Sequence, residues 1–185
     1  ENLADIELLQ GMRELYAKNP TTLVPLLGML TLAGKPYNLH NHFPMEPMFK
    51  VSIPKRCIWK CARQLSKSTS ISANGVLRSV AAPRTDPLRS LYITPRYEQV
   101  RRLSTNYVRP FITGSIIRPL MVNEECTQAV LQRSFSNGSV MYFSFAFLDC
   151  DRVRGLSLDT VYFDECVGKD VDIETPDGKI KVSEM

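Results

Sequence analysis

The middle of the chain alternates segments that have the pattern of β-strands with segments that have the pattern of α-helices. Strand patterns cover 57–61, 89–94 and 158–163, and helix patterns at 68–79 and 96–107 follow the first two. This succession of strands and helices is typical of a parallel sheet with helices packed on it. We therefore predict an α/β fold with a largely parallel sheet flanked by helices.

The N-terminal part has a different pattern. Apolar residues recur with a helical period over 3–18, and Asn19-Pro20 ends that segment. A second helix or apolar turn is expected over 22–32. The stretch 37–49 is rich in Pro, His and Asn, so we expect it to be irregular.

Two β-hairpins are also expected. Asn137-Gly138 separates strand patterns at 132–135 and 139–145, and this dipeptide is a strong signal for a tight hairpin turn. Near the C-terminus, alternating residues over 171–175 and 180–182 flank a turn at Pro176-Asp177-Gly178.

Charge is distributed unevenly along the 185 residues, although the net charge is only +4. Between Lys50 and Arg118 there are 14 Lys and Arg against two acids, and from Pro119 to Met185 there are 12 acids against six bases. A basic middle suits a phosphate-rich partner, either a nucleotide or DNA. It is equally compatible with a solvated basic face.

The cysteines and the hydropathy bound the class of protein. Five cysteines without regular spacing argue against a disulfide framework, and no second pair completes a zinc site beside Cys57 and Cys61. We interpret them as reduced thiols in a cytoplasm. No apolar run approaches the length that spans a bilayer, and the residues after Glu1 do not have the pattern of a signal peptide.

The loop between the first strand and helix is a candidate phosphate-binding loop. In the pattern GxxxxGK[ST], backbone N–H groups hold phosphates, the Lys reaches the β- and γ-oxygens, and the hydroxyl holds Mg²⁺. In Cys61–Ser68 of this chain, Lys67 and Ser68 match, whereas Cys61 and Ser66 replace the two glycines. An ordinary basic loop before a helix is the alternative for this segment.

A second motif follows the last strand of the middle region. Leu158–Phe163 is apolar and ends in Asp164-Glu165, the arrangement in which an Asp orders the shell of Mg²⁺ and a Glu polarises the attacking water. Strands followed by Asp-Glu are common, but this one occurs together with Lys67-Ser68 upstream. We interpret Asp149 and Asp151 as loop carboxylates rather than a metal pair.

Arg63–Thr69, which reads Arg-Gln-Leu-Ser-Lys-Ser-Thr, resembles the P-loop of the large terminase subunit, the DNA-packaging ATPase of tailed phages. The resemblance covers roughly residues 20–166. Other motifs similar to the family occur in its order: Gly34–Tyr37 and His42–Phe49 near the adenine, Thr94-Pro95 with Tyr97–Gln99, Asn137–Ser139, Arg152–Gly155 and Asp164-Glu165.

The resemblance implies a P-loop NTPase fold, ATP and Mg²⁺ as cofactors, and roles for particular residues. Ser68 and Asp164 would hold Mg²⁺, Glu165 would act in hydrolysis, and Arg63 would contact the γ-phosphate. Arg154 would contact ATP or couple subunits, or is a surface arginine. The implied nucleotide-binding residues are Arg63, Gln64, Leu65, Ser66, Lys67, Ser68 and Thr69.

The resemblance also implies partners and a compartment. These are double-stranded DNA, the portal, the small terminase subunit and other copies of the chain in a ring, all in the cytoplasm of a bacterial host. The family's nuclease and coupling motif have no counterpart in these residues. We therefore expect a motor fragment with little or no ATPase activity on its own.

The last 20 residues resemble the opening block of an intein, with a leading Cys, an alternating strand and a T-x-D-G turn. The resemblance implies that the Cys166 thiol attacks the Glu165 carbonyl in an N-to-S acyl shift, and that a C-terminal intein fragment supplies the missing His and Asn. A divergent terminase hairpin is the alternative.

We thus predict three regions: a helical, adenine-side region at 1–50, a P-loop ATPase core at 51–165, and an N-intein fragment at 166–185. Two alternative functions stay open. One is a nucleic-acid-binding module without hydrolysis, carried by the basic helix 96–102. The other is a chain that serves chiefly as one half of a split splicing element.

Overall fold

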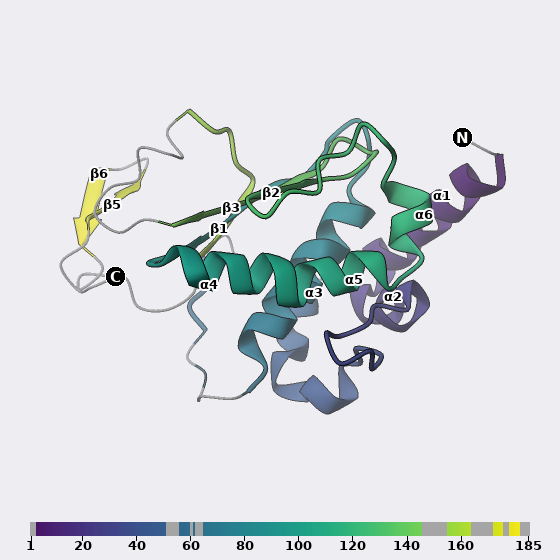
Figure 1. Cartoon of the computed structure of the whole chain (residues 1–185), viewed down its shortest axis with the longest axis horizontal. Coiled ribbons are helices and arrows are strands. Elements are labelled where there is room, and N and C mark those ends of the chain that lie inside the picture. Colours follow the sequence, from purple (N-terminus) through teal and green to yellow (C-terminus); the bar gives the residue numbers. More distant parts are fainter. Residues whose placement is uncertain are drawn as a thin grey trace.

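The chain folds into a mixed α/β structure built on a four-stranded, mostly parallel sheet (Figure 1). It is a computed structural model that describes residues 3–50, 56–59, 61, 65–145, 155–163, 172–175 and 178–181. β1 (Arg89–Thr94) pairs in parallel with β3 (Val140–Phe145) on one side and with β4 (Thr160–Phe163) on the other. β2 (Gln132–Ser134) pairs antiparallel with β3, which gives the order β2-β3-β1-β4. The predicted α/β class with a largely parallel sheet is confirmed.

Helix α3 (Lys67–Ala81) packs against the sheet and confirms the helix predicted over 68–79. A Cβ atom built on Gly75 would lie 2.9 Å from the Met141 Cε, so α3 lies close to β3 where this glycine faces it. Ser68 lines a cavity with Thr94 at the carboxyl end of β1. At the other end of α3, the Asn137 side chain from the β2–β3 turn contacts the last helical turn. The N-terminus of α3 therefore lies at the edge where the parallel strands end.

A helical rod follows β1, consisting of α4 (Tyr97–Arg102), the π-helix η2 (Leu103–Val108) and α5 (Arg109–Thr113). The predicted basic helix 96–107 therefore extends further than the sequence indicated. Within the rod, the Arg109 N–H donates to the Ser104 carbonyl, five residues back. Pro110 explains the wider turn, because its ring has no N–H to donate and would crowd the carbonyl four residues earlier in a regular α-helix.

The N-terminal region begins with α1 (Leu3–Lys18), which has the bounds predicted from the apolar period. The second helix, α2 (Pro20–Leu27), starts and ends earlier than the expected segment 22–32. Its start is set by Asn19, whose Oδ1 accepts a hydrogen bond from the Thr21 N–H at 3.1 Å. Its end is set by Gly28, which takes the left-handed conformation with φ +63°.

The stretch 37–49 is more regular than predicted. Residues His40–Phe49 form the 3₁₀-helical segment η1, with a kink at His42. Short 3₁₀ turns tolerate the two prolines of this segment, and Met45, Met48 and Phe49 are buried. These apolar side chains pack against α2 and α3, and the local composition gives no sign of this burial.

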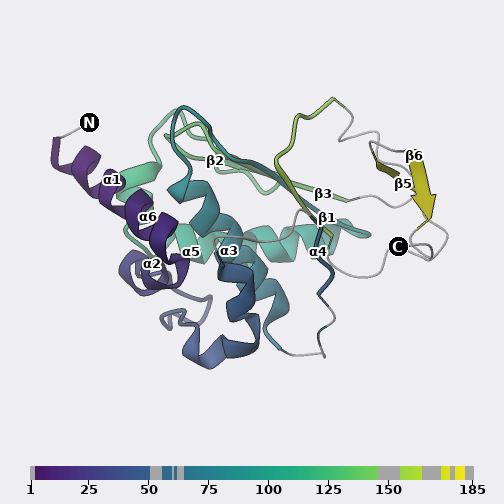
Figure 2. The same ribbon diagram turned by 180° about the vertical axis from the view of Figure 1, so that it is seen from behind.

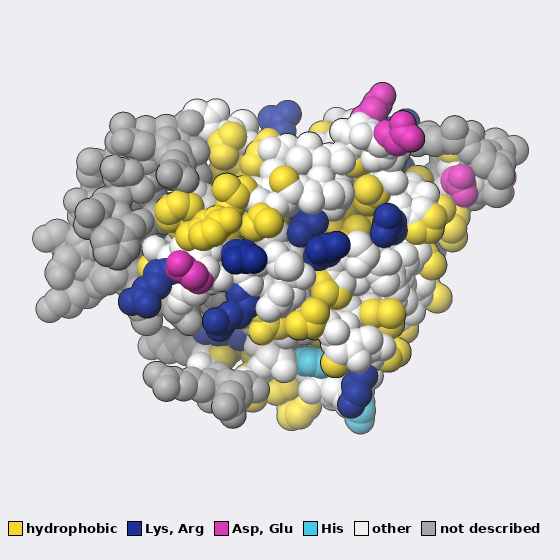
Figure 3. Space-filling model, in the orientation of Figure 1, with side chains coloured by type: hydrophobic (Ala, Val, Ile, Leu, Met, Phe, Trp, Pro, Cys, Tyr) yellow, Lys and Arg dark blue, Asp and Glu magenta, His cyan; other side chains and the backbone are white. Residues whose placement is uncertain are grey.

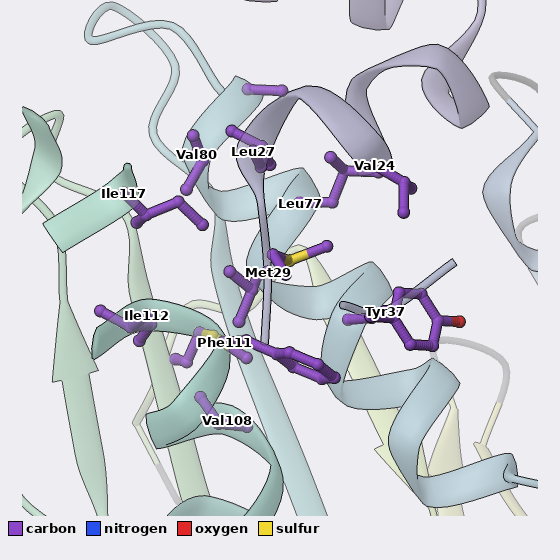
Figure 4. Close-up of a cluster of buried hydrophobic side chains, with 14 of the residues drawn as sticks. Val24, Leu27, Met29, Tyr37, Leu77, Val80, Val108, Phe111, Ile112 and Ile117 are labelled. Carbon is purple, nitrogen blue, oxygen red and sulfur yellow. The ribbon is translucent and has the colours of Figure 1, made fainter. Parts of the chain in front are cut away.

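The hydrophobic core lies on the helical side of the sheet (Figure 4). The close-up shows side chains from the helices and from the loop after α2 meeting at Met29 and Phe111. Helix α6 (Ile117–Met121) closes this cluster with Ile117. Burial of the large aliphatic and aromatic side chains, each contributing about 1.5–3 kcal/mol, fixes the helices on the sheet.

Two strand predictions need correction. The predicted strand at 57–61 is not formed in the described residues 56–59 and 61, and β1 already has a partner on each side. Of the strand predicted over 158–163, only Thr160–Phe163 forms β4, and its Val161 is 39% and its Phe163 51% exposed. The described elements cover only one face of β4, through Tyr162.

Both predicted hairpins are confirmed. The turn at Asn137-Gly138 joins β2 and β3, with Gly138 at φ +88°. At the C-terminus, β5 (Asp172–Thr175) pairs antiparallel with β6 (Gly178–Lys181) as a separate two-stranded sheet. Figures 1 and 2 show this hairpin at the opposite end of the molecule from α1.

Candidate nucleotide-binding site

The N-terminus of α3 carries the residues predicted to bind phosphate. Ser66 precedes the helix with φ +56° and ψ +29°, and it is the only non-glycine residue with positive φ in the described part of the chain. A left-handed backbone there is what the second glycine of the loop pattern normally supplies. Ser66 thus reproduces the glycine conformation at a cost of roughly 1–3 kcal/mol for a strained residue.

The first turn of α3 is suited to hold an anion. The Ser66 side chain makes no capping hydrogen bond to the helix, and the Ser70 N–H donates to the Ser66 carbonyl at 2.9 Å. The N–H groups of a helix's first turn have no partners within the helix, and the helix dipole is positive at this end. Lys67, Ser68 and Thr69 are half-buried there, and Leu65 is 37% exposed.

A cavity of about 130 Å³ opens beside Ser68. Whole small-molecule sites usually enclose about 300–1,000 Å³, so the described residues form room for phosphate groups rather than for a complete nucleotide. The cavity lies at the carboxyl end of β1, where ligands of open α/β sheets bind. Its lining residues are Ser68, Tyr92, Thr94, Gln99, Arg102, Leu103 and Tyr107.

Sequence reasoning missed the contribution of α4 and η2 to this cavity. Gln99 and Arg102 are three residues apart in α4, and both line the cavity with Ser68. From the sequence alone, Arg102 is recognisable only as part of a basic helix. The sequence does place Arg102 in the helix that follows the predicted parallel strand 89–94. Such a helix starts at the sheet edge where its strand ends, and this was the signal that could have assigned Arg102 to the cavity.

The second half of the predicted site follows β4 in the sequence. The last residue of β4, Phe163, pairs with Ile93 next to the end of β1, and Asp164 is the following residue in the sequence. Asp164 and Glu165 themselves lie outside the described residues, as do Arg63, Gln64, Arg154 and Cys166. The structure therefore brings together Ser68, Thr94 and Arg102, and it brings the end of β4 to the same edge of the sheet.

Buried and partly buried hydrogen bonds hold α3 in place between β4 and the N-terminal region. The Asn74 amide donates to the Met48 carbonyl at 2.9 Å and accepts from the Tyr162 hydroxyl at 3.2 Å. Arg78 donates to the same hydroxyl at 3.3 Å. Burial raises the pKa of the Tyr162 phenol, an effect that the nearby Arg78 guanidinium partly offsets. These contacts fix α3 relative to the strand that leads to Asp164.

The stretch predicted to lie near the adenine is divided between core and surface. Tyr37 is buried, donates to the Ser70 hydroxyl at 3.0 Å and packs edge-on against Phe111. Phe43 is instead 70% exposed. The contacts of Tyr37 are those of a core residue that supports α3.

Other kinds of site find less support in the described part of the chain. No three His, Cys, Asp or Glu residues within it lie close enough to hold a metal ion. Cys57, Cys61 and Cys126 are free thiols. No helix in these ranges is both long and apolar enough to cross a membrane.

Comparison with known proteins finds no matching family model, no similar curated protein and no similar solved structure.

Proposed function

We propose that this chain is the N-terminal, ATP-binding part of a phage terminase large subunit, a P-loop motor that packages double-stranded DNA. One observation carries the proposal. Lys67 and Ser68 begin the buried helix α3 at the edge of the sheet where the parallel strands β1 and β4 end, and Asp164-Glu165 follow β4 directly. A Lys-Ser helix start and an Asp-Glu strand end at one sheet edge are what an ATPase of this class requires.

In this proposal each residue has a defined task. The Lys67 ammonium and the first N–H groups of α3 bind the terminal phosphates, and Arg63 adds positive charge at the γ-phosphate. The Ser68 hydroxyl and the Asp164 carboxylate hold Mg²⁺, which neutralises charge on the phosphates. Glu165 orients and deprotonates the attacking water. Arg102, which lines the cavity beside Ser68, contributes a further positive charge.

ATP titration of the complete 185-residue chain tests the proposal. A fluorescent ATP analogue should bind, and Lys67→Ala should weaken binding by tenfold or more, because the loss of a charge-assisted phosphate contact costs about 1.5–3 kcal/mol. Lys18→Ala is the matched control, since Lys18 is an exposed lysine at the end of α1. Equal affinities of the parent and Lys67→Ala would reject the ATP site. They would favour a nucleic-acid-binding module without hydrolysis.

The family's portal, small terminase subunit and ring of identical subunits are further partners in this proposal. Within it, the isolated chain hydrolyses little or no ATP, because neighbouring subunits and the coupling motif are absent from the assay. A robust ATP turnover by the purified chain would contradict this part.

The C-terminal hairpin favours a second function for the same chain. β5 and β6 form their own two-stranded sheet instead of extending the four-stranded one. This arrangement supports a separate element after Glu165, and we propose that it is the start of an intein with Cys166 as its nucleophile. The Cys166 thiol would take the acyl group of Glu165 from the amide nitrogen, which gives a thioester and a free amine.

Mixing the chain with C-terminal intein fragments tests this second function by mass spectrometry. Splicing should give a ligated product and a released peptide that begins at Cys166, and Cys166→Ala should abolish both. Cys126→Ala is the matched control, because Cys126 is a free thiol elsewhere in the chain. Ligation that persists in Cys166→Ala would exclude this mechanism.

A further inference from the structure

Arginines are concentrated along the rod of α4, η2 and α5. Between Arg96 and Arg118 the sequence has five arginines and a single acid, Glu98, and three of these arginines, Arg101, Arg102 and Arg109, lie within the rod. All five side chains are exposed, and Figure 3 shows basic side chains in a row across the face on which α4 and α5 lie. Most of the acidic side chains visible in this view lie toward the upper right, and one lies beside the row of basic side chains. The rod therefore presents positive charge to solvent with little local compensation.

The π-helix aligns two of these arginines. In an uninterrupted α-helix, residues eight apart such as Arg101 and Arg109 would lie about 80° apart around the axis, because each residue turns the chain by about 100°. The π turn between them takes in about one extra residue per turn, as the Ser104 carbonyl accepts from the Arg109 N–H. This brings Arg101 and Arg109 toward the same side of the rod.

A buried guanidinium strengthens the positive field under the same turn. Arg133 on β2 is only 4% exposed, and it donates to the Ser104 carbonyl at 3.0 Å and to the Gln128 Oε1 at 3.3 Å. Both acceptors are neutral. Burial, and then repulsion from Arg109, lower the pKa of Arg133 to about 10. Arg133 is therefore a second cation beneath Arg109, and the described residues supply no counter-ion for it. This excess of positive charge favours an anionic partner on the exposed side of Arg109.

Three exposed guanidinium groups along one helical rod suit the backbone of a duplex. Guanidinium forks bind phosphate oxygens in two-point contacts, and each contact releases counterions from the DNA. The 17 residues of the rod would span roughly 25 Å at about 1.5 Å per residue. A DNA duplex carries about one negative charge per 1.7 Å of its axis, so a stretch as long as the rod presents many phosphates to these arginines.

We propose that the exposed face of this rod, with Arg101 and Arg109 as its main contacts, binds the phosphate backbone of double-stranded DNA. The inference deepens the proposed function, because it assigns the surface that holds the transported DNA. It rests on that function only in naming double-stranded DNA as the anionic partner. Its observations are independent of the nucleotide cavity. Arg101 and Arg109 do not line that cavity, whereas Arg102 does.

Fluorescence anisotropy of the complete chain with a labelled 30-base-pair duplex of mixed sequence tests the inference between 50 and 200 mM salt. The double variant Arg101→Ala/Arg109→Ala should weaken binding at low salt by roughly tenfold or more, and it should reduce the slope of log K against log salt by about two. Arg101→Lys/Arg109→Lys should keep most of the slope, because lysine still binds phosphate as a point charge.

The matched control is Lys18→Ala/Lys35→Ala, which removes two charges from exposed lysines outside the rod. It should leave the slope unchanged. An equal loss in both double-alanine variants would overturn the inference, as would unchanged binding of the arginine variant. A labelled polyglutamate peptide that binds as tightly as the duplex, with the same sensitivity to Arg101 and Arg109, would also overturn it.

The same variants separate this inference from the proposed function. Arg101→Ala/Arg109→Ala should bind ATP like the parent chain, and Lys67→Ala should bind DNA like the parent chain. DNA binding that depends on the rod, together with ATP binding that does not depend on Lys67, would retain this inference and reject the ATP site.

Discussion

At the scale of single residues, Asn137 ties the β2–β3 turn to helix α3. Its amide nitrogen donates to the Ser79 and Ala82 carbonyls, both at 2.8 Å, and its Oδ1 accepts from the Ser139 N–H at 3.1 Å. The side chain is 4% exposed. The Asn-Gly pair, which the sequence marks only as a turn, therefore also completes the C-terminal end of the candidate phosphate-binding helix.

Asn137→Ala should destabilise the protein by about 1–3 kcal/mol, because it leaves buried carbonyl groups without donors. Urea unfolding followed by circular dichroism measures this change. Asn41→Ala, at an exposed position, should change the free energy of unfolding by less than about 0.5 kcal/mol. Equal effects of the two substitutions would show that the Asn137 contacts do not stabilise the fold.

Tyr37 gives a pH-dependent prediction. Burial raises the pKa of Tyr37 to about 12, partly offset by its hydrogen bond to Ser70. The folded state keeps this phenol protonated at pH values where the unfolded chain, with an ordinary pKa near 10, has released the proton. The contribution of the protonated Tyr37 phenol to the stability of the folded state is therefore complete below pH 10. It is lost as the pH rises from about 10 to 12.

Urea unfolding of the parent and of Tyr37→Phe between pH 9 and 12 measures that contribution. The parent should lose stability more steeply than the variant above pH 10. Parallel curves would show that the folded state does not hold Tyr37 in its protonated form. Tyr16 and Tyr162 are present in both proteins and cancel in the comparison.

At the scale of secondary structure, the sequence predicted the elements whose signals are local. The bounds of α1 and β1 follow from the apolar period and from Pro95, which ends the strand. The strand expected at 57–61 failed because a strand also needs a neighbour, and strand pairing is not a local property. The π turn of η2 depends on how Pro110 is accommodated in the rod, which no periodicity reveals.

Helix α3 illustrates how close packing limits substitution. Gly75→Ala should change stability by less than about 1 kcal/mol, because the gain in helix propensity offsets a small shift of the flexible Met141 end. Gly75→Val should instead destabilise by about 1–3 kcal/mol, because a branched side chain cannot fit between α3 and β3. Thermal unfolding of both variants tests this, and equal stability of the valine and alanine variants would contradict the packing described here.

At the scale of the whole molecule, the sequence predicted the class of fold but not the order of its strands or the place of the rod. Strand–helix alternation indicated a parallel sheet, yet the order β2-β3-β1-β4 depends on long-range pairing. Gln99, Arg102 and Tyr107 join Ser68 only because the rod after β1 starts at the carboxyl edge of the sheet. Neither of the two sequence motifs, at Lys67 and at Asp164, indicates that the rod contributes to the cavity.

The central proposal is that Ser68 and Asp164 hold one Mg²⁺–ATP at this edge of the sheet. The most direct test is a double-mutant cycle of Ser68→Ala and Asp164→Asn, in which ATP affinity is measured with Mg²⁺ and with a chelator. Each single variant should lose most of the affinity that Mg²⁺ adds, and the double variant should lose little more, because both residues hold the same ion. Additive losses, or an unchanged effect of Mg²⁺ in the double variant, would contradict the account.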